Sequence, residues 1–363
     1  MANKRHTDYT VGWICALPVE MAAAIAMLDE EHPDLPTSPG DHNTYFHGRI
    51  GLHCIVIACL PLGIYGTASA ASVAANMRSS YPLLQVGLMV GIAGGVPTAE
   101  SDIRLGDVVV SKPTRDSGGV IQYDFGKTIA GGQFEHTGSL NKPPHAALTA
   151  MARLQAQQQL SQGHIPAILS QAAARYQGID TDFVYPGQDQ DQLFDSSYDH
   201  PNTEETCNSR DKARTVLRRP RASNSPRIHY GLIASGNQVM KHAATRDRLA
   251  RKFGFLCFEM EAAGLVDHFP CVVVRGICDY ADSHKNKQWQ PYAAMTAAAY
   301  TKALLSIMPL TYDSRSARMV RWYGGDLRAL PEPSFVATDR PDGECTHTGW
   351  QDLISTYSLQ INS

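Results

Sequence analysis

The 363-residue chain lacks the cysteine spacings that mark metal sites and disulfide frameworks. Its eight cysteines include no CxxC pair and no zinc-like spacing. Four of them lie in short apolar runs, where a free thiol behaves as a small hydrophobic side chain: Cys15, Cys54, Cys257 and Cys271. This usage favours a reducing, cytoplasmic setting, and we expect no metal ligation.

Long apolar runs and a strong charge bias are missing as well. The one N-terminal run that follows basic residues is interrupted by Pro18 and Glu20, so we expect neither a secretion signal nor a membrane span. The formal net charge of −3 argues against a surface that coats nucleic acid. No GxxxxGK[ST] motif is present, which excludes the usual nucleotide-triphosphate cradle.

The composition is that of a globular protein with an ample core, with 43% hydrophobic and 18% charged residues. We expect one large α/β domain over residues 1–310. Residues 188–226 are polar, acidic in their first half and basic in their second, which predicts a flexible insertion or a mobile lid. Residues 311–363 are rich in Pro, Gly and Asp and are interpreted as a C-terminal tail.

Apolar runs and helix formers alternate along the first 310 residues. They predict strands at 11–17, 85–91, about 107–111 and up to Ser235, with a hairpin over 44–60. Helices are predicted at 18–28, 67–77, 145–177, 243–253 and 289–309. This alternation is typical of the α/β class.

Residues 255–282 are the most informative stretch. Two apolar runs, 255–260 and 271–278, predict buried strands, and 261–269 predicts a helix between them that Pro270 ends. A strand–helix–strand unit normally forms a right-handed parallel crossover. Glu261 and Asp279 would then lie at the same carboxyl edge of one sheet, where open α/β sheets bind ligands.

Other useful groups follow predicted strands. These are Glu20, the glycine turns PLGIYG (61–66) and IAGG (92–95), and the run SGNQVM (235–240). If the sheet is mostly parallel, all of them gather with Glu261 and Asp279 at one edge. Carboxylates accept hydrogen bonds from paired hydroxyls, so such a pocket favours sugar recognition over metal binding.

The motifs FEMEAAGL, VVVRGICDYAD and GIAGG, with an early strand followed by Pro-Val-Glu, resemble the purine nucleoside phosphorylase/nucleosidase superfamily. The resemblance is closest to methylthioadenosine/adenosylhomocysteine nucleosidases, and QYDFGKT with GSLN resembles a fungal subgroup often fused to signalling NTPase modules. It covers about residues 9–310, without 188–226. It implies a three-layer α/β/α sandwich with a mixed, twisted central sheet, no cofactor and a homo-oligomer.

The resemblance also implies roles for individual residues. Asp279 would protonate or hydrogen-bond N7 of the purine. Glu261, with Met260 beneath the sugar, would hold the ribose hydroxyls, and Glu20 would orient and deprotonate the attacking water. Further substrate-binding positions are Glu259, Gly63, Gly94, Asn237, Val239, Met240 and Trp289.

Elementary chemistry agrees with these roles. Breaking an N-glycosidic bond develops positive charge on the sugar and negative charge on the base. Carboxylates near the ribose and an acid near the base oppose both charges, and acid–base assistance typically contributes ~10²–10⁴-fold in rate. Burial of Asp279 would keep it protonated for this purpose.

Water and phosphate are alternative acceptors of the sugar. Phosphorylases of the family hold phosphate with an arginine in the first turn of the helix after strand one. That turn here contains Glu20 and no basic residue, and a carboxylate repels phosphate, so the sequence favours hydrolysis. Arg49, Arg104 or an arginine from a neighbouring subunit remain alternative anion sites.

Each candidate also has a purely structural interpretation. Glu261 would be a helix first-turn acid, Asp279 a helix cap with Asp282 as the reactive group, and Glu20 a solvated helix residue. GIAGG would be a tight turn and Trp289 a surface packing residue. Val239 and Met240 would be ordinary core residues. His229, His242 and His284 would be structural or exposed, with contact of one of them to the 5′ end of the sugar as the open alternative.

The sequence therefore predicts a nucleosidase that hydrolyses adenosine-like ribonucleosides to free base and ribose. Three alternatives stay open. These are a phosphate-dependent phosphorylase, a nucleosidase acting on AMP or ATP in which the basic run at 218–221 meets phosphates, and a non-catalytic nucleoside-sensing module.

Overall fold

The computed structural model describes residues 4–114, 116–160, 164–175, 183–200 and 212–309. The predicted tail at 311–363 lies outside these residues, as does part of the segment 188–226. The strands are β1 (Val11–Cys15), β2 (Glu30–His32), β3 (Tyr45–Ile50), β4 (His53–Cys59), β5 (Val86–Gly95), β6 (Val108–Ser111), β7 (Val120–Gln122), β8 (Gly126–Thr128), β9 (Phe134–His136), β10 (Ile228–Ser235), β11 (Phe255–Glu259) and β12 (Cys271–Asp279).

The helices of the described residues follow the expected order. The α-helices are α1 (Pro18–Ala26), α2 (Thr67–Ser80), α3 (His145–Leu160), α4 (His164–Arg175), α5 (Ala243–Phe253) and α6 (Gln290–Ile307). The short 3₁₀ helices are η1 (His6–Asp8), η2 (Ala130–Gly132), η4 (Gln188–Gln190), η6 (Lys212–Arg214) and η7 (Ala262–Gly264). None of the described helices is long and apolar enough to cross a membrane.

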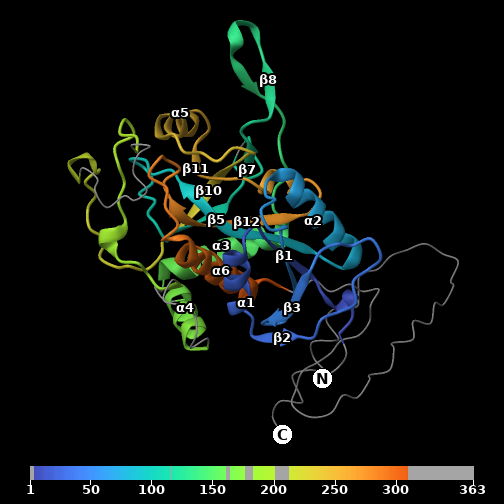
Figure 1. The fold of residues 1–363 in the computed structure, drawn as a ribbon. Helices are drawn as coiled ribbons and strands as arrows, with labels where there is room; N and C mark the ends of the chain where they lie inside the picture. Colours follow the sequence, from blue (N-terminus) through green and yellow to red (C-terminus); the bar gives the residue numbers. More distant parts are fainter. Residues whose placement is uncertain (1–3, 115, 161–163, 176–182, 201–211, 310–363) are drawn as a thin grey trace, which may run out of the picture. The chain divides into compact units, whose positions relative to one another are not determined.

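Ten strands of the described chain form one mixed sheet in the order β11-β10-β6-β12-β5-β1-β4-β3-β2, with β7 beside β10 (Figure 1). The strands β4, β1, β5 and β12 are parallel to one another. The strands β6, β10 and β11 run the opposite way, because β6 is antiparallel to β12. The expected mixed α/β sheet is confirmed.

The long strand β5 closes part of this sheet on itself. Its first half pairs with β1, and its last residues, Gly94 and Gly95, pair with Phe258 and Cys257 of β11. The strand β12 accompanies β5 along nearly its whole length. The five strands β5, β12, β6, β10 and β11 therefore form a closed ring, which brings the ends of strands of opposite direction together.

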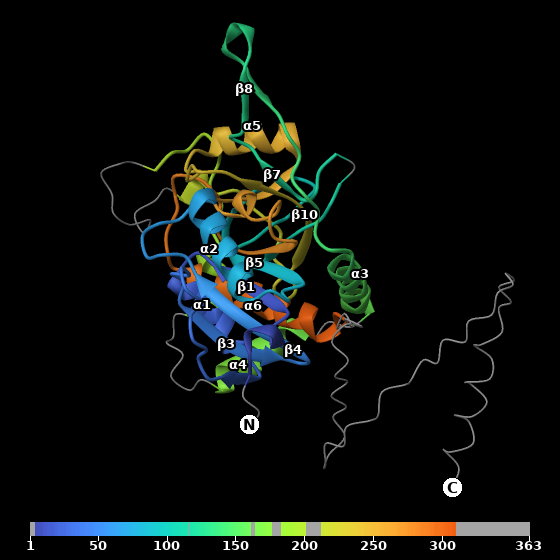
Figure 2. The same ribbon diagram turned by 90° about the vertical axis from the view of Figure 1, so that its right-hand side faces the viewer.

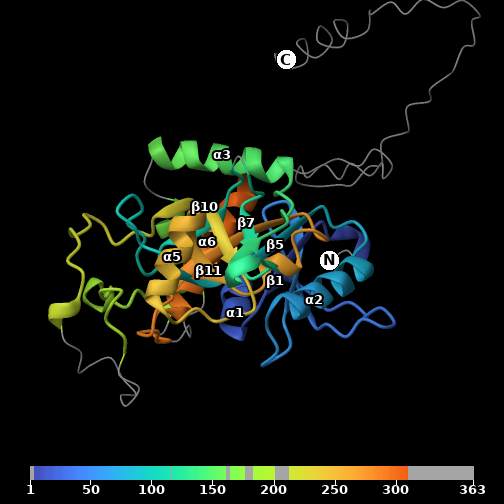
Figure 3. The ribbon, with the colours of Figure 1, turned by 90° about the horizontal axis from the view of Figure 1, so that it is seen from above.

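Helices cover both faces of the sheet, so strand side chains alternate between two cores. Trp13 and Val274 face the core shared with α1, α3, α4 and α6, whereas Ile14 and Val273 face the one shared with α2 and η7. Figure 3 shows α3 and α2 on opposite sides of the strands. The small hairpin β8–β9 projects away from the sheet in Figures 1 and 2. This is the expected three-layer arrangement.

Three local predictions are wrong: the helix at 261–269, the parallel crossover that contains it, and the turn at 92–95. Residues 261–269 form only the 3₁₀ helix η7 followed by turns, and β11 is antiparallel to β12, so no parallel crossover joins them. A Cβ on Gly264 would lie 1.9 Å from the carbonyl oxygen of Thr67, so the chain packs here against the start of α2. The GIAGG motif is not a turn but the second half of β5.

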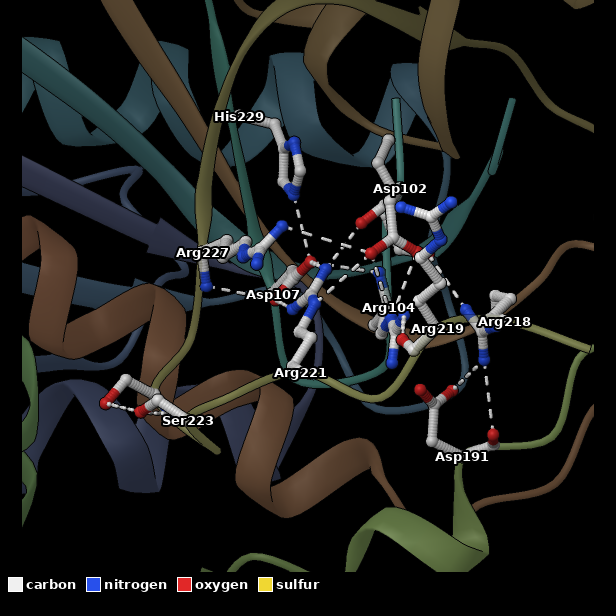
Figure 4. Close-up of polar contacts among 12 residues, drawn as sticks. Asp102, Arg104, Asp107, Asp191, Arg218, Arg219, Arg221, Ser223, Arg227 and His229 are labelled. Carbon is white, nitrogen blue, oxygen red and sulfur yellow. Dashed lines mark hydrogen bonds and ion pairs between the residues drawn. The ribbon is translucent and has the colours of Figure 1, made fainter. Parts of the chain in front are cut away.

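The described part of the segment 188–226 is tied to the core by buried ion pairs. Arg221 donates to Asp107 at 2.6 and 2.7 Å, and Arg218 donates to Tyr280 Oη at 2.8 Å and contacts Asp191 at 2.9 Å. His229 adds a contact of 2.9 Å to Asp107 (Figure 4). Asp107 and Tyr280 thus hold the basic half of the segment beside β6 and β12, and Asp191 joins it to the acidic half.

Candidate functional site

Glu20 lies at the first turn of α1 and is 3% exposed. Its Oε2 accepts hydrogen bonds from the backbone N–H groups of Ala16 at 2.7 Å and Leu17 at 3.0 Å, and its Oε1 accepts one from Ile92 at 2.8 Å. Burial raises the pKa of Glu20, and Arg275 and these N–H donors offset that rise only in part. Glu20 is therefore a fixed, buried carboxyl group of increased basicity, not a solvated helix residue.

Arg275 of β12 gathers three carboxyl groups. Its guanidinium is 1% exposed, forms a short ion pair with Glu259 and lies 3.4 Å from Glu261 Oε2. Gly91 explains how Glu20 joins them, because a Cβ there would lie 2.3 Å from Glu20 Oε1 and 2.7 Å from an Arg275 guanidinium nitrogen. The absence of a side chain on Gly91 is what lets these groups meet.

Glu259 and Glu261 have different surroundings. Glu259 accepts hydrogen bonds from the backbone N–H groups of Glu261 and Ala262 as well as from Arg275, which makes it a structural anchor of the η7 turn. Glu261 has a longer contact to Arg275, and burial, partly offset by Arg275, raises its pKa to about 7. The carboxyl oxygens of Glu261 can therefore still accept hydrogen bonds from a ligand.

Asp279 ends β12 and is 5% exposed. Its Oδ1 accepts the N–H of Ala281 at 2.9 Å, and its Oδ2 forms an ion pair with Lys285 Nζ at 2.9 Å. A Cβ on Gly94 would lie 2.7 Å from Asp279 Oδ1. Gly94 is thus needed beside the acid, as Gly91 is needed beside Glu20.

The strand β5 sets the separation between the two ends of the site. Glu20 accepts from the N–H of Ile92, and Asp279 pairs with Gly94, two residues further along the strand. Two residues of extended strand span roughly 7 Å. The acids predicted from the sequence therefore do converge, through ring closure around β5.

The other predicted substrate-binding residues lie in neighbouring loops. Asn237, after β10, accepts from the N–H of Thr67 at 3.0 Å, so the loop after β10 contacts the start of α2. Gly63 lies just before α2 with φ +79° and open space where a Cβ would be. Val239 is 46% exposed, Met260 is half-buried, and Met240 packs in a core with Phe255 and Phe258.

Trp289 does not present an exposed ring to the acids, because its side chain is buried. It is 1% exposed and packs against Tyr185, Tyr292 and Cys278, and its Nε1 donates to the carbonyl of Gln190 at 3.3 Å. Asp282, the alternative to Asp279, accepts from the N–H of His284 at 2.9 Å and lies 4.0 Å from Arg246.

The histidines have structural surroundings. His229 contacts Asp107, His284 stacks on Phe194 with ring centroids 4.2 Å apart, and His242 bonds Thr245 at 2.8 Å.

The arginines considered as anion sites are engaged with carboxylates. Arg49 contacts Glu30 at 2.8 Å at the β2–β3 edge, and Arg104 contacts Asp102 at 3.0 Å. Two residues of the basic run at 218–221, Arg218 and Arg221, are also paired with carboxylates in this cluster (Figure 4). A hollow beside this cluster is lined by Arg104, Asp107, Tyr185, Arg221 and Tyr292 and does not include the three acids.

Sequence reasoning missed two residues of the site. Arg275 had a signal, because a single charge in the β-branched run VVVRGIC must have a buried partner. Lys285 had none, because a lysine in a polar loop (DSHKNK) is ordinarily a solvated side chain. Only the fold shows that its ammonium group reaches Asp279.

Comparison with known proteins identifies the family. A profile of the phosphorylase superfamily matches residues 10–306. The chain belongs to that superfamily. Glu20, Glu261 and Asp279 lie within the matched residues. They also belong to the motifs that resemble the nucleoside phosphorylase/nucleosidase superfamily.

The curated proteins that the chain matches include longer proteins. A nucleotide-binding leucine-rich repeat (NLR)-like protein of Hyaloscypha variabilis is 48% identical over 302 residues, which cover 83% of this chain and 29% of that protein. A 5'-methylthioadenosine/S-adenosylhomocysteine nucleosidase of Mycobacterium bovis is 23% identical over 83% of this chain and 97% of its own length. The ATP nucleosidase Cap17 of Escherichia coli is 25% identical over 79% of this chain and 49% of its length. The chain thus spans less than a third of the NLR-like protein and about half of Cap17.

Solved structures share the fold. Futalosine hydrolase of Helicobacter pylori superposes with a TM-score of 0.53 at 16% identity, covering 83% of this chain and 98% of its own. An S-adenosylhomocysteine nucleosidase from Streptococcus pyogenes gives a TM-score of 0.52 at 18% identity, covering 85% of this chain and 100% of its own. The expected nucleoside phosphorylase-like fold is confirmed.

Proposed function

We propose that this chain is a purine nucleosidase that hydrolyses the N-glycosidic bond of adenosine-like ribonucleosides. The observation that carries the proposal is the gathering of Glu20, Glu261 and Asp279 around the second half of β5. Nucleosidases among the relatives, including one matched along 97% of its length, support the reaction class.

The carboxyl groups divide the reaction between them. Glu20 takes a proton from water as the water attacks the anomeric carbon, and its raised pKa suits a general base. Glu261 accepts hydrogen bonds from the ribose hydroxyls, and Arg275 keeps the neighbouring carboxylates from repelling one another. Asp279 transfers a proton to the base as the C–N bond breaks and its electron pair passes to the base nitrogen.

Hydrolysis is favoured over phosphorolysis because Glu20 lies where an attacking group would enter. A buried carboxylate repels phosphate, and the nearest described guanidinium, that of Arg275, is already paired with Glu259 and Glu261. A complete set of acids also argues against a purely sensing module.

A second copy of the chain is part of the proposal. The loop before α2, beside Asn237, exposes Leu62 (85%), Ile64 (61%) and Tyr65 (54%). A cluster of exposed apolar side chains next to a site is typical of an interaction surface. We propose that a homo-oligomer covers this loop, which light scattering of the purified chain measures.

A nucleoside panel tests the function. We expect adenosine and 5'-modified adenosines to release adenine at rates independent of added phosphate, with ribose or its 5'-modified form as the second product. AMP and ATP are expected to react more slowly, because Arg218 and Arg221 are paired with Asp191 and Asp107. Chromatography of both products decides the matter. Phosphate-dependent release with ribose 1-phosphate, or a preference for ATP, would replace the proposal with one of its alternatives.

The pH dependence of kcat/KM follows from Glu261. Its pKa of about 7 means that Glu261 becomes ionised, and able to accept from both ribose hydroxyls, as the pH rises through neutrality. We expect kcat/KM for adenosine to rise about tenfold between pH 6 and 8. Glu261→Gln should remove this limb and reduce the preference for adenosine over 2'-deoxyadenosine. A limb that persists unchanged in Glu261→Gln would assign it to Glu20 instead.

A further inference from the structure

Lys285 lies in the loop between β12 and α6, with its Nζ 2.9 Å from Asp279 Oδ2. The carboxylate is 4% exposed and the lysine side chain is 30% exposed, so the ammonium group connects the buried acid to solvent. We propose that Lys285 supplies the proton that Asp279 passes to the leaving base. This role rests on the proposed nucleosidase reaction.

Both carboxylate oxygens of Asp279 face hydrogen-bond donors. One oxygen accepts the backbone N–H of Ala281 at 2.9 Å, and the other receives the Lys285 ammonium and the thiol of Cys278 at 3.2 Å. Donors to both oxygens stabilise a carboxylate. In the contact between Lys285 and Asp279 the ammonium group holds the proton, so Lys285 is the neighbour from which Asp279 can receive the proton that the base needs.

The groups facing Lys285 keep it charged. Burial lowers its pKa, but Asp279, Cys278 and Asp282 raise it, and the net direction is above the ordinary value. Asp282 is shared with Arg246 at 4.0 Å and with His284 at 3.9 Å, so Asp279 is the carboxylate in direct contact with the ammonium. Lys285 is therefore protonated at neutral pH.

The segment 188–226 holds this loop in place. Phe194 stacks on His284, the residue before Lys285, and the N–H of His200 donates to Ser283 Oγ at 2.9 Å. Arg218 donates to the hydroxyl of Tyr280, the residue after Asp279. A lysine on a loop fastened at both ends can present its ammonium group to Asp279 in a fixed geometry.

The proton balance of the step is complete. As the C–N bond breaks, its electron pair passes to the base, Asp279 delivers a proton to a ring nitrogen, and Lys285 passes its own proton to Asp279. Water gives its hydroxyl to the anomeric carbon and its proton to Glu20. Lys285 then regains a proton from solvent and Glu20 releases one, so that nucleoside and water yield base and ribose.

Three variants and two substrates test this role. Adenosine needs protonation to leave, whereas 4-nitrophenyl β-D-ribofuranoside releases a weakly basic phenolate that does not. We expect Lys285→Gln to lower kcat for adenosine by about 10²-fold, and for the nitrophenyl riboside by no more than about threefold. Lys285→Arg keeps the ion pair but its guanidinium does not give up a proton, so it should not restore the rate. Lys287→Gln, on an exposed lysine of the same loop, should behave as wild type.

The pH profile gives a readout from adenosine alone. The Glu261 limb belongs to the free enzyme and therefore to kcat/KM, whereas kcat reports the complex in which the ribose hydroxyls already engage Glu261. Wild-type kcat should therefore be flat between pH 6 and 8. Lys285→Gln should lose about tenfold in kcat per pH unit there, because an unassisted carboxylate must take its proton from solvent.

The proposal is overturned if Lys285→Gln keeps the wild-type profile, if Lys285→Arg restores the rate, or if both substrates lose equally. Wild-type protein that releases no base from adenosine would instead refute the nucleosidase reaction, and the role of Lys285 with it.

Discussion

Replacing Asp279 with asparagine is expected to lower the release of adenine from adenosine by about 10²–10⁴-fold. Asparagine preserves the size of the side chain and can still accept the N–H of Ala281, but it cannot relay a proton from Lys285. The defect should depend on the leaving group, because hydrolysis of 4-nitrophenyl ribofuranoside needs no acid at the base. Steady-state rates for both substrates measure it.

Asp282→Asn is the matched control for that variant. Asp282 is equally buried and lies three residues away, and it was the alternative acid in the DYAD motif. Its side chain caps His284 and faces Arg246, so its loss should affect stability more than the chemical step. Unimpaired adenine release by Asp279→Asn, or a larger loss in Asp282→Asn at equal thermal stability, would mean that the acid has been misassigned.

Replacing Glu20 with glutamine is expected to reduce hydrolysis of both substrates by about 10²–10⁴-fold. Attack by water at the anomeric carbon is common to the two reactions, and an amide cannot accept the proton. Comparing the two substrates therefore distinguishes the two roles. Asp279→Asn should leave hydrolysis of the nitrophenyl riboside nearly unchanged, whereas Glu20→Gln should slow it. Rates for the two variants, measured side by side, make this comparison.

Glu100→Gln, at an exposed position before β6, serves as the control for Glu20→Gln and should leave both rates unchanged. If Glu20→Gln impaired only adenosine hydrolysis, Glu20 would not be the base for water. Circular dichroism and thermal unfolding confirm that each variant is folded before its rates are compared.

The order of elements could be predicted from the sequence because local patterns carry that information. The Pro18 start of α1, the hairpin β3–β4 and the alanine-rich α6 all follow from turn residues and apolar spacing. Strand direction could not be predicted in this way. Nothing local in residues 255–278 shows that β11 runs against β12, because that depends on the ring closure through Gly94 and Gly95.

The sequence likewise predicts only those parts of the candidate site that depend on local patterns. Motifs identify Glu20, Glu261 and Asp279, but the sequence predicts their convergence from parallel strands, whereas the pairing of β5 with β11 produces it. Trp289 was placed by its offset from Asp279, and an offset cannot show that Tyr185 and Tyr292 would enclose the ring. The contact of Lys285 with Asp279 depends on the conformation of its loop. Residues of the segment 188–226, which are distant in sequence, stabilise that conformation.

Incubation of wild-type protein with adenosine in ¹⁸O-labelled, phosphate-free water tests most directly whether the acids around β5 act together on one sugar–base bond. We predict early release of adenine together with ribose that carries ¹⁸O at C1, above the label that ribose alone acquires in the same water over the same time. Adenosine that remains intact, or a sugar product formed only when phosphate is added, would contradict the account.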